Sequence, residues 1–541
     1  MNNRESLKPL APYETGGLGH WNLYFLLKFA LLWMGLLNVQ VLPNLVFAAV
    51  LLVPLRNRLL VILRTLIALP VGVALFYQDT WFPPFSRLLD QPGVLNFSAD
   101  YLLELAGRFI DWSVCGWLLV LAVVYRFVSP WLRMTTFSLV GLAWLGGSSL
   151  FALQAVPQTA VTQQVQGTAQ VVVNPEPDSA TLEAYLQKFY VTEATRQVEF
   201  KPVASAAQPF DVLLINICSL SWDDLDEIGL RDNALLQQMD VVFDNFNSAT
   251  SYSGPAAIRL LRASCGQQPH SKLYDTVPKQ CLLFDELKKL GFTGELMLNH
   301  TGQFEGFMDE VRSQGSPPAP AVSTSSLPRE LIGFDSSPIW RDRQVLDKWW
   351  RHREELADSR VALFYNTTTL HDGNRTVTAS GGTERSNFKV RAQGLIDDLS
   401  TFMQALERSG RRVVVVIVPE HGAGLHGDRM QISGMREIPS PSITHVPVGI
   451  KLIGMGGQPR TAPLHVSEPS SYLALSEFIN RLYAAPSQEG QGPDWTTLMT
   501  GLPQTPAVSE NSGTVVLDYA GKPYVRIKEN GTWLPYPQRL K

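Results

Sequence analysis

The chain has 541 residues and a formal net charge of −4 at pH 7. This length exceeds what a single hydrophobic core normally supports, so we expect at least two domains. The slightly acidic balance excludes the broad basic surface that nucleic-acid binding requires, so no nucleic-acid partner is expected. Hydropathy is unevenly distributed, because Leu, Val, Phe and Trp dominate residues 21–155 whereas the remainder has the composition of a soluble protein.

The N-terminal part contains apolar runs that are typical of membrane helices, which need about 20 predominantly apolar residues. Five such runs are present, at 21–38, 41–55, 59–77, 112–129 and 132–153. The second is short and contains Pro43 and Asn44, so it is the least typical. A cleaved signal peptide followed by a helical core is the alternative. Five long runs with very few charges favour a membrane domain with five transmembrane helices.

The connections between these runs indicate their orientation. Arg56 and Arg58 follow the second run, and Arg126 follows the fourth, whereas the connection between the third and fourth is rich in Asp and Glu. Cytoplasmic loops carry an excess of Lys and Arg, so Arg4 and Lys8 are placed inside with the other basic residues. Five spans then place the C-terminal half on the outer side of the membrane.

We therefore expect a membrane domain at residues 1–153, a linker with a short helix at 154–204, and a second domain at 205–541. Gln154 to Asp178 is rich in Gln, Thr, Val and Pro, a composition typical of an extended linker. Ala180 to Tyr190 has the pattern of a short amphipathic helix.

From residue 205 onward, apolar runs alternate with helical patterns, which is typical of an α/β domain with a mostly parallel central sheet. The expected strands are 211–217, 292–298, 361–366, 412–418 and 446–453. The expected helices are 255–264, 281–290, 343–357, 388–409 and 470–483. Three short runs at 515–518, 524–527 and 532–534, separated by turn residues, predict a small C-terminal antiparallel β element.

Four of the expected strands end in residues that bind metals or transfer protons. They are followed by Cys218, by Asn299-His300, by a loop containing His371-Asp372, and by Glu420-His421. Open parallel sheets bind their ligands outside the carboxyl ends of the strands. The strand ends together therefore indicate a functional site.

The segment Pro419-Glu420-His421-Gly422 directly follows an apolar run. Past the end of a strand the chain turns, so a carboxylate and an imidazole can converge on one cation. The alternative is a strand that ends in a satisfied Glu and a surface His. Cys218 is either a small buried hydrophobe or a zinc thiolate, because sulfur and imidazole ligands select zinc over magnesium or calcium.

His371 lies in a polar loop and is a candidate general acid rather than a ligand. Arg429 follows the Glu420-His421 segment and is a candidate for binding a phosphoryl group or a polymer hydroxyl. A surface ion pair explains Arg429 equally well.

A candidate nucleophile precedes the expected helix that begins at Pro255. Thr250, Ser251 and Ser253 all fit by spacing, and the Gly-Pro that follows favours Ser253. Unpaired backbone N–H groups and the helix dipole favour an anion at this position. A serine whose oxygen also touches a divalent cation loses its proton more easily and can attack phosphorus or sulfur. The alternative is a plain N-cap serine.

Cys265 and Cys281 are separated by a loop with Gly, Pro and Ser. In an oxidising compartment they could form a disulfide, which would contribute roughly 3 kcal/mol. Two buried thiols are the alternative.

The chain resembles a known group of enzymes. The five N-terminal spans, the strand end Asn216 to Trp222, the segment Ser251 to Arg259 and the Pro-Glu-His-Gly loop are similar to those of phosphoethanolamine transferases in the alkaline phosphatase/sulfatase superfamily. The resemblance covers essentially the whole chain. It is strongest to the transferases of bacterial cellulose-secretion systems, the G subunits.

The resemblance implies an alkaline phosphatase-like domain on the periplasmic side of the bacterial inner membrane. It implies transfer of phosphoethanolamine from phosphatidylethanolamine, a membrane lipid, to the 6-hydroxyl of glucose units in cellulose, with cellulose synthase subunits as partners. Ser253 matches the nucleophile that forms a covalent intermediate. The residues that match zinc ligands are Cys218, Glu420 and His421, with Ser253 completing the tetrahedron.

The resemblance assigns further roles. His371 matches the proton-transferring histidine, Tyr252 and Arg429 match substrate-side residues, and Cys265 with Cys281 match a disulfide pair. The superfamily's nucleophile is more often threonine or a modified cysteine, and its first-strand ligand is usually acidic. Ser253 and Cys218 therefore separate this chain from transferases that modify lipid A.

Two other functions fit the sequence. A membrane-anchored sulfatase or phosphatase would use water as the acceptor. A non-catalytic scaffold of a secretion complex would need neither zinc nor Ser253.

Overall fold

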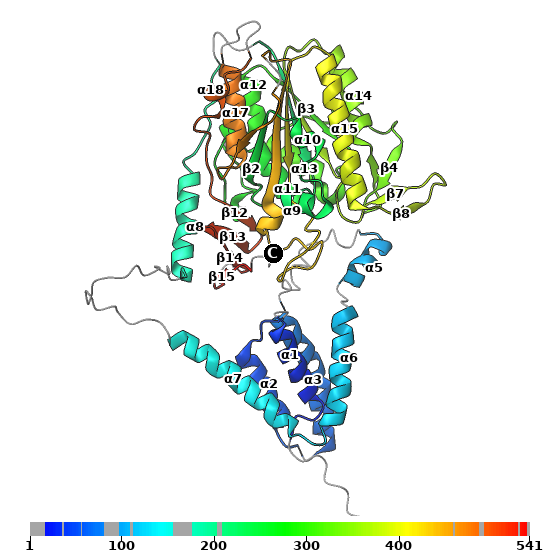
Figure 1. Ribbon diagram of the computed structural model, residues 1–541, viewed down its shortest axis with the longest axis vertical. Coiled ribbons are helices and arrows are strands. Elements are labelled where there is room, and N and C mark those ends of the chain that lie inside the picture. The colour runs from blue at the N-terminus through cyan, green and yellow to red at the C-terminus, as the bar shows by residue number, and fades with distance from the viewer. Residues whose placement is uncertain are drawn as a thin grey trace, which may run out of the picture. The chain divides into compact units, whose positions relative to one another are not determined.

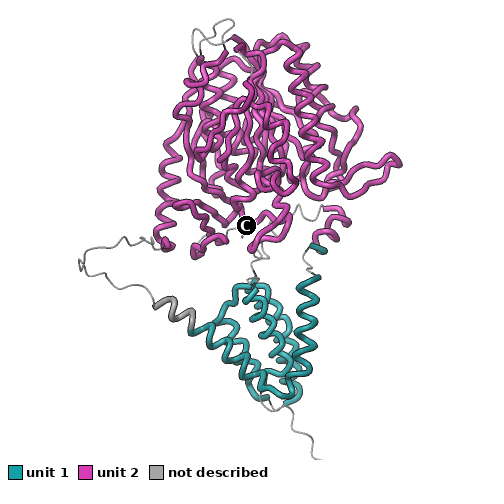
Figure 2. The backbone as a smooth tube through the Cα atoms, in the orientation of Figure 1, with its two compact units in different colours: residues 1–85, 106–174 teal, residues 86–105, 175–541 magenta. Residues whose placement is uncertain are grey.

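The computed structural model describes residues 17–34, 37–55, 57–80, 97–108, 112–154, 176–202, 208–457, 460–485, 492–528 and 531–537. The chain divides into two compact units, residues 1–85 with 106–174 and residues 86–105 with 175–541 (Figure 2). Outside the described residues lie most of the expected linker and three basic residues on which the expected orientation depends, Arg4, Lys8 and Arg56.

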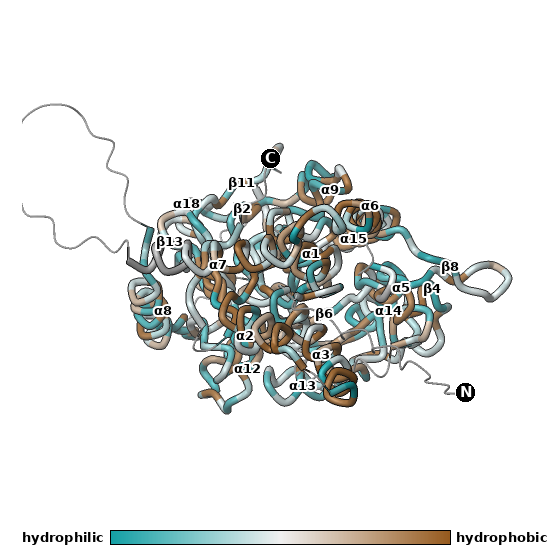
Figure 3. Tube along the Cα trace, turned by 90° about the horizontal axis from the view of Figure 1, so that it is seen from below, coloured by the Kyte–Doolittle hydropathy of each residue, from teal (hydrophilic) through white to brown (hydrophobic). Residues whose placement is uncertain are grey.

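The first unit has an apolar helix at each of the five expected positions. They are α1 (Trp21–Trp33), α2 (Val41–Leu52), α3 (Arg58–Asp79), α6 (Trp112–Val128) and α7 (Met134–Gln154). Figure 3 colours α2, α3 and α6 largely as hydrophobic. Among the described residues, α3 is the one helix that is long and apolar enough to cross a membrane, and the others are shorter apolar helices.

A mostly parallel seven-stranded sheet forms the centre of the second unit, as the sequence predicts (Figure 1). In spatial order its strands are β11 (Leu464–Val466), β2 (Val241–Asn247), β10 (His445–Ile453), β9 (Val413–Pro419), β1 (Asp211–Ile217), β6 (Val361–Thr367) and β3 (Thr293–Leu298). Strand β10 is antiparallel to both of its neighbours. Strands β2 and β11 were not expected from the sequence.

Apolar side chains cover both faces of this sheet, which explains why its strands are continuous apolar runs. Successive side chains alternate between the faces, so Val212 and Leu214 belong to one core while Leu213 and Ile215 belong to the other. The first core includes residues of α11 (Ser253–Leu261), α12 (Leu283–Lys289), α13 (Phe307–Gly315) and α17 (Tyr472–Ala484). The second includes residues of α9 (Trp222–Ile228), α10 (Ala234–Gln237), α14 (Asp342–Glu355) and α15 (Phe388–Arg408).

Two smaller sheets complete the second unit. The C-terminal antiparallel element is confirmed, with the expected runs as β13 (Thr514–Tyr519), β14 (Lys522–Arg526) and β15 (Leu534–Pro535), and it contains a further strand that was not expected, β12 (Val508–Asn511). Its apolar side chains pack against α8 (Ser179–Glu193), the helix expected at residues 180–190. An unexpected antiparallel sheet is formed by β5 (Pro338–Trp340), β4 (Arg329–Ile332), β7 (Arg375–Val377) and β8 (Thr383–Arg385). Further short helices among the described residues include α16 (Pro441–Thr444) and α18 (Trp495–Met499), and α5 (Ala99–Arg108) follows the third apolar helix in sequence.

The register of the central strands brings three strand ends to one level. Ile217 of β1 is paired with Thr367 of β6 on one side and with Pro419 of β9 on the other. The residues that follow these three strands therefore emerge side by side at the carboxyl edge of the sheet. This edge is the place where the sequence indicates a functional site.

Candidate metal centre and active site

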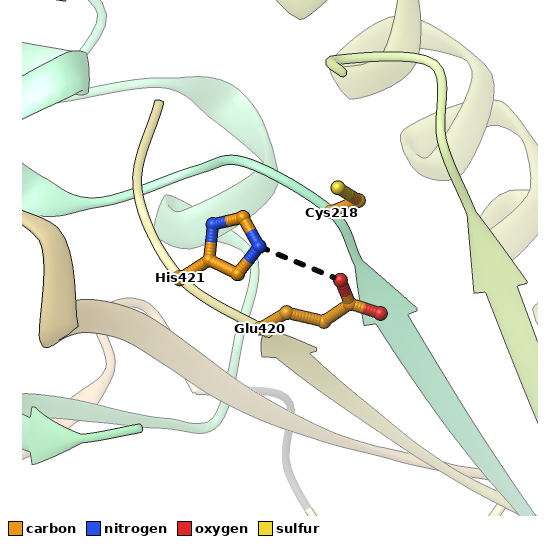
Figure 4. A group of neighbouring side chains, drawn as sticks. All are labelled: Cys218, Glu420 and His421. Atoms are coloured by element: carbon orange, nitrogen blue, oxygen red, sulfur yellow. Dashed lines mark ion pairs between the residues drawn. The ribbon is translucent and has the colours of Figure 1, made fainter. Parts of the chain in front are cut away.

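Cys218, Glu420 and His421 come together at this edge and are buried (Figure 4). Cys218 directly follows β1, while Glu420 and His421 directly follow β9. One ligand atom from each lies within 4.8 Å of the other two, and Glu420 Oε2 is 3.9 Å from His421 Nε2. A thiol, a carboxylate and an imidazole at this spacing form the donor set that the sequence predicts for a metal.

The chemistry of these donors fits a divalent cation. Asn366 donates a hydrogen bond to Glu420 Oε1, whereas the buried Oε2 has no hydrogen-bond partner by distance and angle among the described residues. Nδ1 of His421 lies 2.9 Å from its acceptor, the carbonyl oxygen of Gly422, which leaves the lone pair of Nε2 facing the group. A cation would supply the missing partner of the Glu420 oxygen.

Burial controls the protonation of the group. It raises the pKa of Glu420 to about 7, and burial together with the Glu420 charge raises the pKa of Cys218 to about 12. Burial and the Arg436 charge hold the pKa of His421 well below its usual range. Without a cation the thiol and the imidazole are therefore neutral. A bound cation lowers the pKa of Cys218 and of Glu420, because it favours the thiolate and the carboxylate over their protonated forms.

Ser253 is the first residue of α11 and lies beside the three donors. Its Oγ is 3.4 Å from Cys218 Sγ and 3.4 Å from His421 Nε2. The helix begins two residues earlier than the sequence predicts, so this hydroxyl lies in its first turn, where backbone N–H groups have no intrahelical acceptor. Thr250 and Ser251 are instead fully buried and bound to Asn511. The structure thus brings Ser253, of the three candidates, to the donors.

The loop after His421 is fixed by Asp224 of α9. The carboxylate of Asp224 accepts hydrogen bonds from the N–H of Ala423 at 2.7 Å and from the N–H of Leu425 at 3.2 Å. Gly422 is required by close packing, since a Cβ at this position would lie 2.6 Å from the hydroxyl of Ser221. Asp224 was not predicted, because nothing in its local sequence indicates a partner almost 200 residues away.

A cavity of about 370 Å³ opens in front of the donors. Ser253, His421, His371 and Tyr252 all line it, so the structure brings these candidates to one space. Nδ1 of His371 is 2.7 Å from the carbonyl oxygen of Asp372, and burial with the Arg436 charge lowers the pKa of His371 to about 3. A neutral His371 whose Nδ1–H is occupied has a lone pair at Nε2 that can accept a proton.

Tyr252 and His300 also line this cavity. The hydroxyl of Tyr252 donates to Glu437 at 2.6 Å. His300, at one of the predicted strand ends, is held by Asn366 at 2.8 Å. Asn366 therefore connects His300 to the Glu420 carboxylate.

Arg436 also lines the cavity, whereas Arg429 is exposed and is not one of the lining residues. Nη1 of Arg436 is 3.1 Å from the hydroxyl of Ser219 and 3.4 Å from His421 Nε2. Sequence reasoning missed Arg436, since it lies within an irregular loop and ends no strand. The structure thus brings a guanidinium to the site from a position seven residues beyond the expected one.

The cysteine pair expected from the sequence is present as a disulfide between Cys265 and Cys281. It closes a loop with a sequence separation of 16 residues. The prediction of a disulfide is therefore confirmed.

The second unit is thus an α/β protein with a buried Cys-Glu-His donor group at the carboxyl edge of its sheet and a serine at a helix start beside it. Two family models match the chain: "Cellulose biosynthesis protein BcsG C-terminal domain" over residues 166–533 and "Cellulose biosynthesis protein BcsG N-terminal domain" over residues 21–147. The chain belongs to the BcsG family, which confirms the resemblance noted from the sequence.

Two curated relatives carry the name "Cellulose biosynthesis protein BcsG". The one from Escherichia coli is 48% identical over 96% of this chain and 97% of its own length. The one from Salmonella typhimurium is 46% identical over 98% of both chains. Among solved structures, the C-terminal periplasmic domain of EcEptC from Escherichia coli in complex with Zn is similar with a TM-score of 0.41 and 14% identity, covering 62% of this chain and 95% of that one. Because this TM-score is below 0.5, the assignment rests on the family match.

Proposed function

We propose that this protein is a zinc-dependent transferase that moves phosphoethanolamine from phosphatidylethanolamine to the 6-hydroxyl of glucose units in cellulose. The observation that carries the proposal is the position of Ser253 within 3.4 Å of both Cys218 and His421. The name of the relatives, a cellulose biosynthesis protein, supports cellulose as the acceptor.

Cys218, Glu420 and His421, together with Ser253, would hold the zinc ion. Thiolate and imidazole ligands favour zinc over the harder cations magnesium and calcium. When bound, the ion lowers the pKa of the serine hydroxyl and neutralises charge on the phosphoryl oxygens.

In the first half-reaction Ser253 Oγ forms a bond to the phosphorus of the lipid, and the bond from phosphorus to the diacylglycerol oxygen breaks. Ser253 gives up its proton, and the departing oxygen takes up one proton through His371, so the number of protons is unchanged. Arg436 and the N–H groups at the start of α11 face the negative phosphoryl oxygens. The product is a phosphoethanolamine ester of Ser253.

In the second half-reaction the hydroxyl of glucose attacks from the side that diacylglycerol has left. His371 Nε2 accepts the hydroxyl proton, for which its lone pair is available because Nδ1 faces the carbonyl of Asp372. The bond between phosphorus and Ser253 Oγ then breaks, and the serine regains a proton. Arg436 takes the substrate-side role that the resemblance gives to Arg429, and Tyr252 lines the same space.

We propose further that residues 1–153 anchor the enzyme in the bacterial inner membrane through five helices and that residues 205–541 act in the periplasm next to the cellulose synthase. Most large apolar side chains that are exposed among the described residues belong to the first unit, which suits a lipid environment. The Cys265–Cys281 disulfide suits an oxidising compartment. A donor that stays in the bilayer explains why the enzyme is membrane-bound.

The intact mass of the full chain after incubation with phosphatidylethanolamine vesicles tests the proposal. We expect the mass to increase by one phosphoethanolamine group, located on Ser253 by peptide mapping and absent from Ser253→Ala. Adding soluble glucan should discharge the adduct and produce modified glucan. If the adduct on Ser253 is lost at the same rate without glucan, the protein is a hydrolase. If the zinc-loaded protein forms no adduct, the transferase proposal is contradicted.

A further inference from the structure

A short segment from between the third and fourth apolar helices is part of the catalytic unit. Residues 86–105 group with residues 175–541, although the residues on both sides of them in sequence belong to the first unit. The described portion begins at Phe97 and continues into α5. Phe97 and Tyr101 of this segment line the same cavity as Ser253 and His371.

Direct contacts join Tyr101 to the loop that carries His371. The hydroxyl of Tyr101 donates a hydrogen bond to Asp372 Oδ2 at 2.9 Å, across 271 residues of sequence. The Tyr101 ring, whose residue is 7% exposed, lies so close to Gly373 that a Cβ there would be 2.6 Å from a ring carbon. Gly373 also has a φ of +77°, so both the space and the backbone require glycine. The loop and the tyrosine ring are therefore closely fitted.

The same segment supports His371 from its ring face. The imidazole of His371 stacks on Phe334 with centroids 4.1 Å apart and an interplanar angle of 22°. Phe334 is in turn packed between Tyr101 at 6.1 Å and Phe97 at 5.3 Å. The N–H of Ser98 donates to the carbonyl oxygen of Phe334 at 2.9 Å. Phe334 is thus fixed both by rings and by the backbone of the segment.

Tyr101 therefore contacts both of the groups that hold the His371 ring, the Asp372 loop and Phe334. One restraint runs from the Nδ1 of His371 to the carbonyl oxygen of Asp372, whose side chain accepts from Tyr101. The other runs through Phe334, on which the imidazole lies. Each restrains a different degree of freedom, because the hydrogen bond fixes the rotation of the ring in its plane and the stacking fixes the plane itself.

We infer that Tyr101 is a positioning residue for His371 and that residues 97–105 complete the active site from outside the 205–541 domain. This inference rests on the proposed function of His371 in proton transfer. Tyr101 acts on His371 through the Asp372 loop, to which its hydroxyl donates. Loss of its hydroxyl should slow proton transfer while the lipid still binds.

Tyr101→Phe in the full chain tests this inference, with Tyr185→Phe as the matched control. Tyr185 is a half-buried tyrosine of α8 that packs on Tyr519 and is not one of the residues that line the cavity. A hydrogen bond to a charged group contributes about 1.5–3 kcal/mol, so the expected decrease in kcat for both half-reactions is roughly tenfold or more. KM for the lipid should be unchanged, and Tyr185→Phe should match the unaltered protein. A raised KM with unchanged kcat would overturn the inference.

A second measurement works without substrate. The rate at which diethylpyrocarbonate modifies His371, read by peptide mass spectrometry, should increase in Tyr101→Phe and stay constant in Tyr185→Phe. Equal rates in all three proteins would overturn the positioning role even if the protein is a transferase. If the unaltered protein forms no adduct, the proposed function fails, whereas the reactivity of His371 still reports on Tyr101.

Asp372→Ala provides an independent route should Tyr101→Phe fold poorly. It removes the acceptor of the Tyr101 hydroxyl together with a carboxylate charge that raises the pKa of His371, so it should lower kcat at least as much as Tyr101→Phe. The double variant should be no slower than Asp372→Ala alone, because the Tyr101 hydroxyl acts through the Asp372 carboxylate. Additive losses would show that Tyr101 and Asp372 act separately and would contradict the inference.

Discussion

Asn366 donates a hydrogen bond to one carboxylate oxygen of Glu420 at 2.5 Å, while the other, buried oxygen has no hydrogen-bond partner in the part of the chain that the structure describes. This division leaves one oxygen oriented and the other available for a cation. Asn366 also contacts Asn216 at 3.0 Å, so its own amide is fixed between β1 and β9. Groups that orient a metal ligand in this way commonly contribute as much to affinity as a weak ligand.

The first prediction concerns this orientation. Asn366→Ala should weaken zinc binding about ten- to hundredfold, because Glu420 loses the hydrogen bond that fixes its carboxylate. Competition with a chromogenic chelator measures the affinity without any substrate. Asn480→Ala is the control, since Asn480 lies on α17 and donates to the backbone of Glu199 at 3.3 Å. Equal affinity in both variants would contradict the role of Asn366.

The second prediction separates two arginines. Arg436→Gln should slow formation of the Ser253 adduct by about 10²-fold, because a donor facing the phosphoryl oxygens is lost. Arg429→Gln should stay within about twofold, since exposed charges contribute little. The adduct formed in a single turnover is measured for both. The reverse order would return the substrate-side role to Arg429.

The sequence predicted the donors for a physical reason. Buried parallel strands are continuous apolar runs, and their carboxyl ends meet at one edge, so Cys218 and Glu420-His421 could be placed together without coordinates. Arg436 could not be found in this way, because it lies in an irregular loop. The position of this loop depends on a distant contact, the hydrogen bond that Asn511 donates to the carbonyl oxygen of Arg436. Tyr101 could not be predicted either, since its hydrogen-bond partner Asp372 lies 271 residues away in the sequence.

The strands that escaped prediction are short or mixed in polarity. Strand β2 reads Val-Val-Phe-Asp-Asn-Phe-Asn, which interrupts the apolar run at Asp244 and Asn245. The four strands of the β5-β4-β7-β8 sheet have three or four residues each, too few for a period to be recognised. Pairing with distant strands, and not local propensity, determines these elements.

The third prediction concerns the disulfide. Replacing both Cys265 and Cys281 by Ala should lower the free energy of unfolding by about 3 kcal/mol, because a loop of this length constrains the unfolded chain. Thermal unfolding with and without a reductant measures the effect. Reductant should lower the Tm of the unaltered protein and leave that of the double variant unchanged. A reductant-sensitive double variant would contradict this explanation.

The fourth prediction concerns a buried ion pair in the first unit. Lys28 Nζ is 2.7 Å from Asp79 and 2.8 Å from Asn44, and the three side chains are at most 1% exposed. Removing one charge leaves the other buried and unpaired, so Lys28→Met or Asp79→Asn should each destabilise the unit by about 3–5 kcal/mol. The variant with Lys28→Met and Asp79→Leu should recover most of this loss. Helical circular dichroism on heating in detergent measures each variant, and a double variant as unstable as the singles would contradict the pairing.

The last prediction concerns the pH dependence of stability at Asp342. Its buried carboxylate accepts hydrogen bonds from Tyr365 at 2.6 Å and from Thr369, two residues before His371. Burial nevertheless raises the pKa of Asp342 to about 6, above the ordinary value of 3.8. Between these values the folded protein binds more protons than the unfolded chain, so this group's contribution to stability increases as the pH falls from about 6 to about 4.

Asp342→Asn removes this titration while keeping an oxygen that accepts hydrogen bonds. We therefore expect the difference in Tm between the unaltered protein and Asp342→Asn to shift in favour of the unaltered protein as the pH falls from 7 to 5. Measuring the difference at each pH cancels the contributions of all other groups. Glu477→Gln serves as the control, because Glu477 pairs with Arg481 on the surface of α17. A Tm difference for Asp342→Asn that is constant across this range would show that Asp342 titrates at its ordinary value in the folded protein.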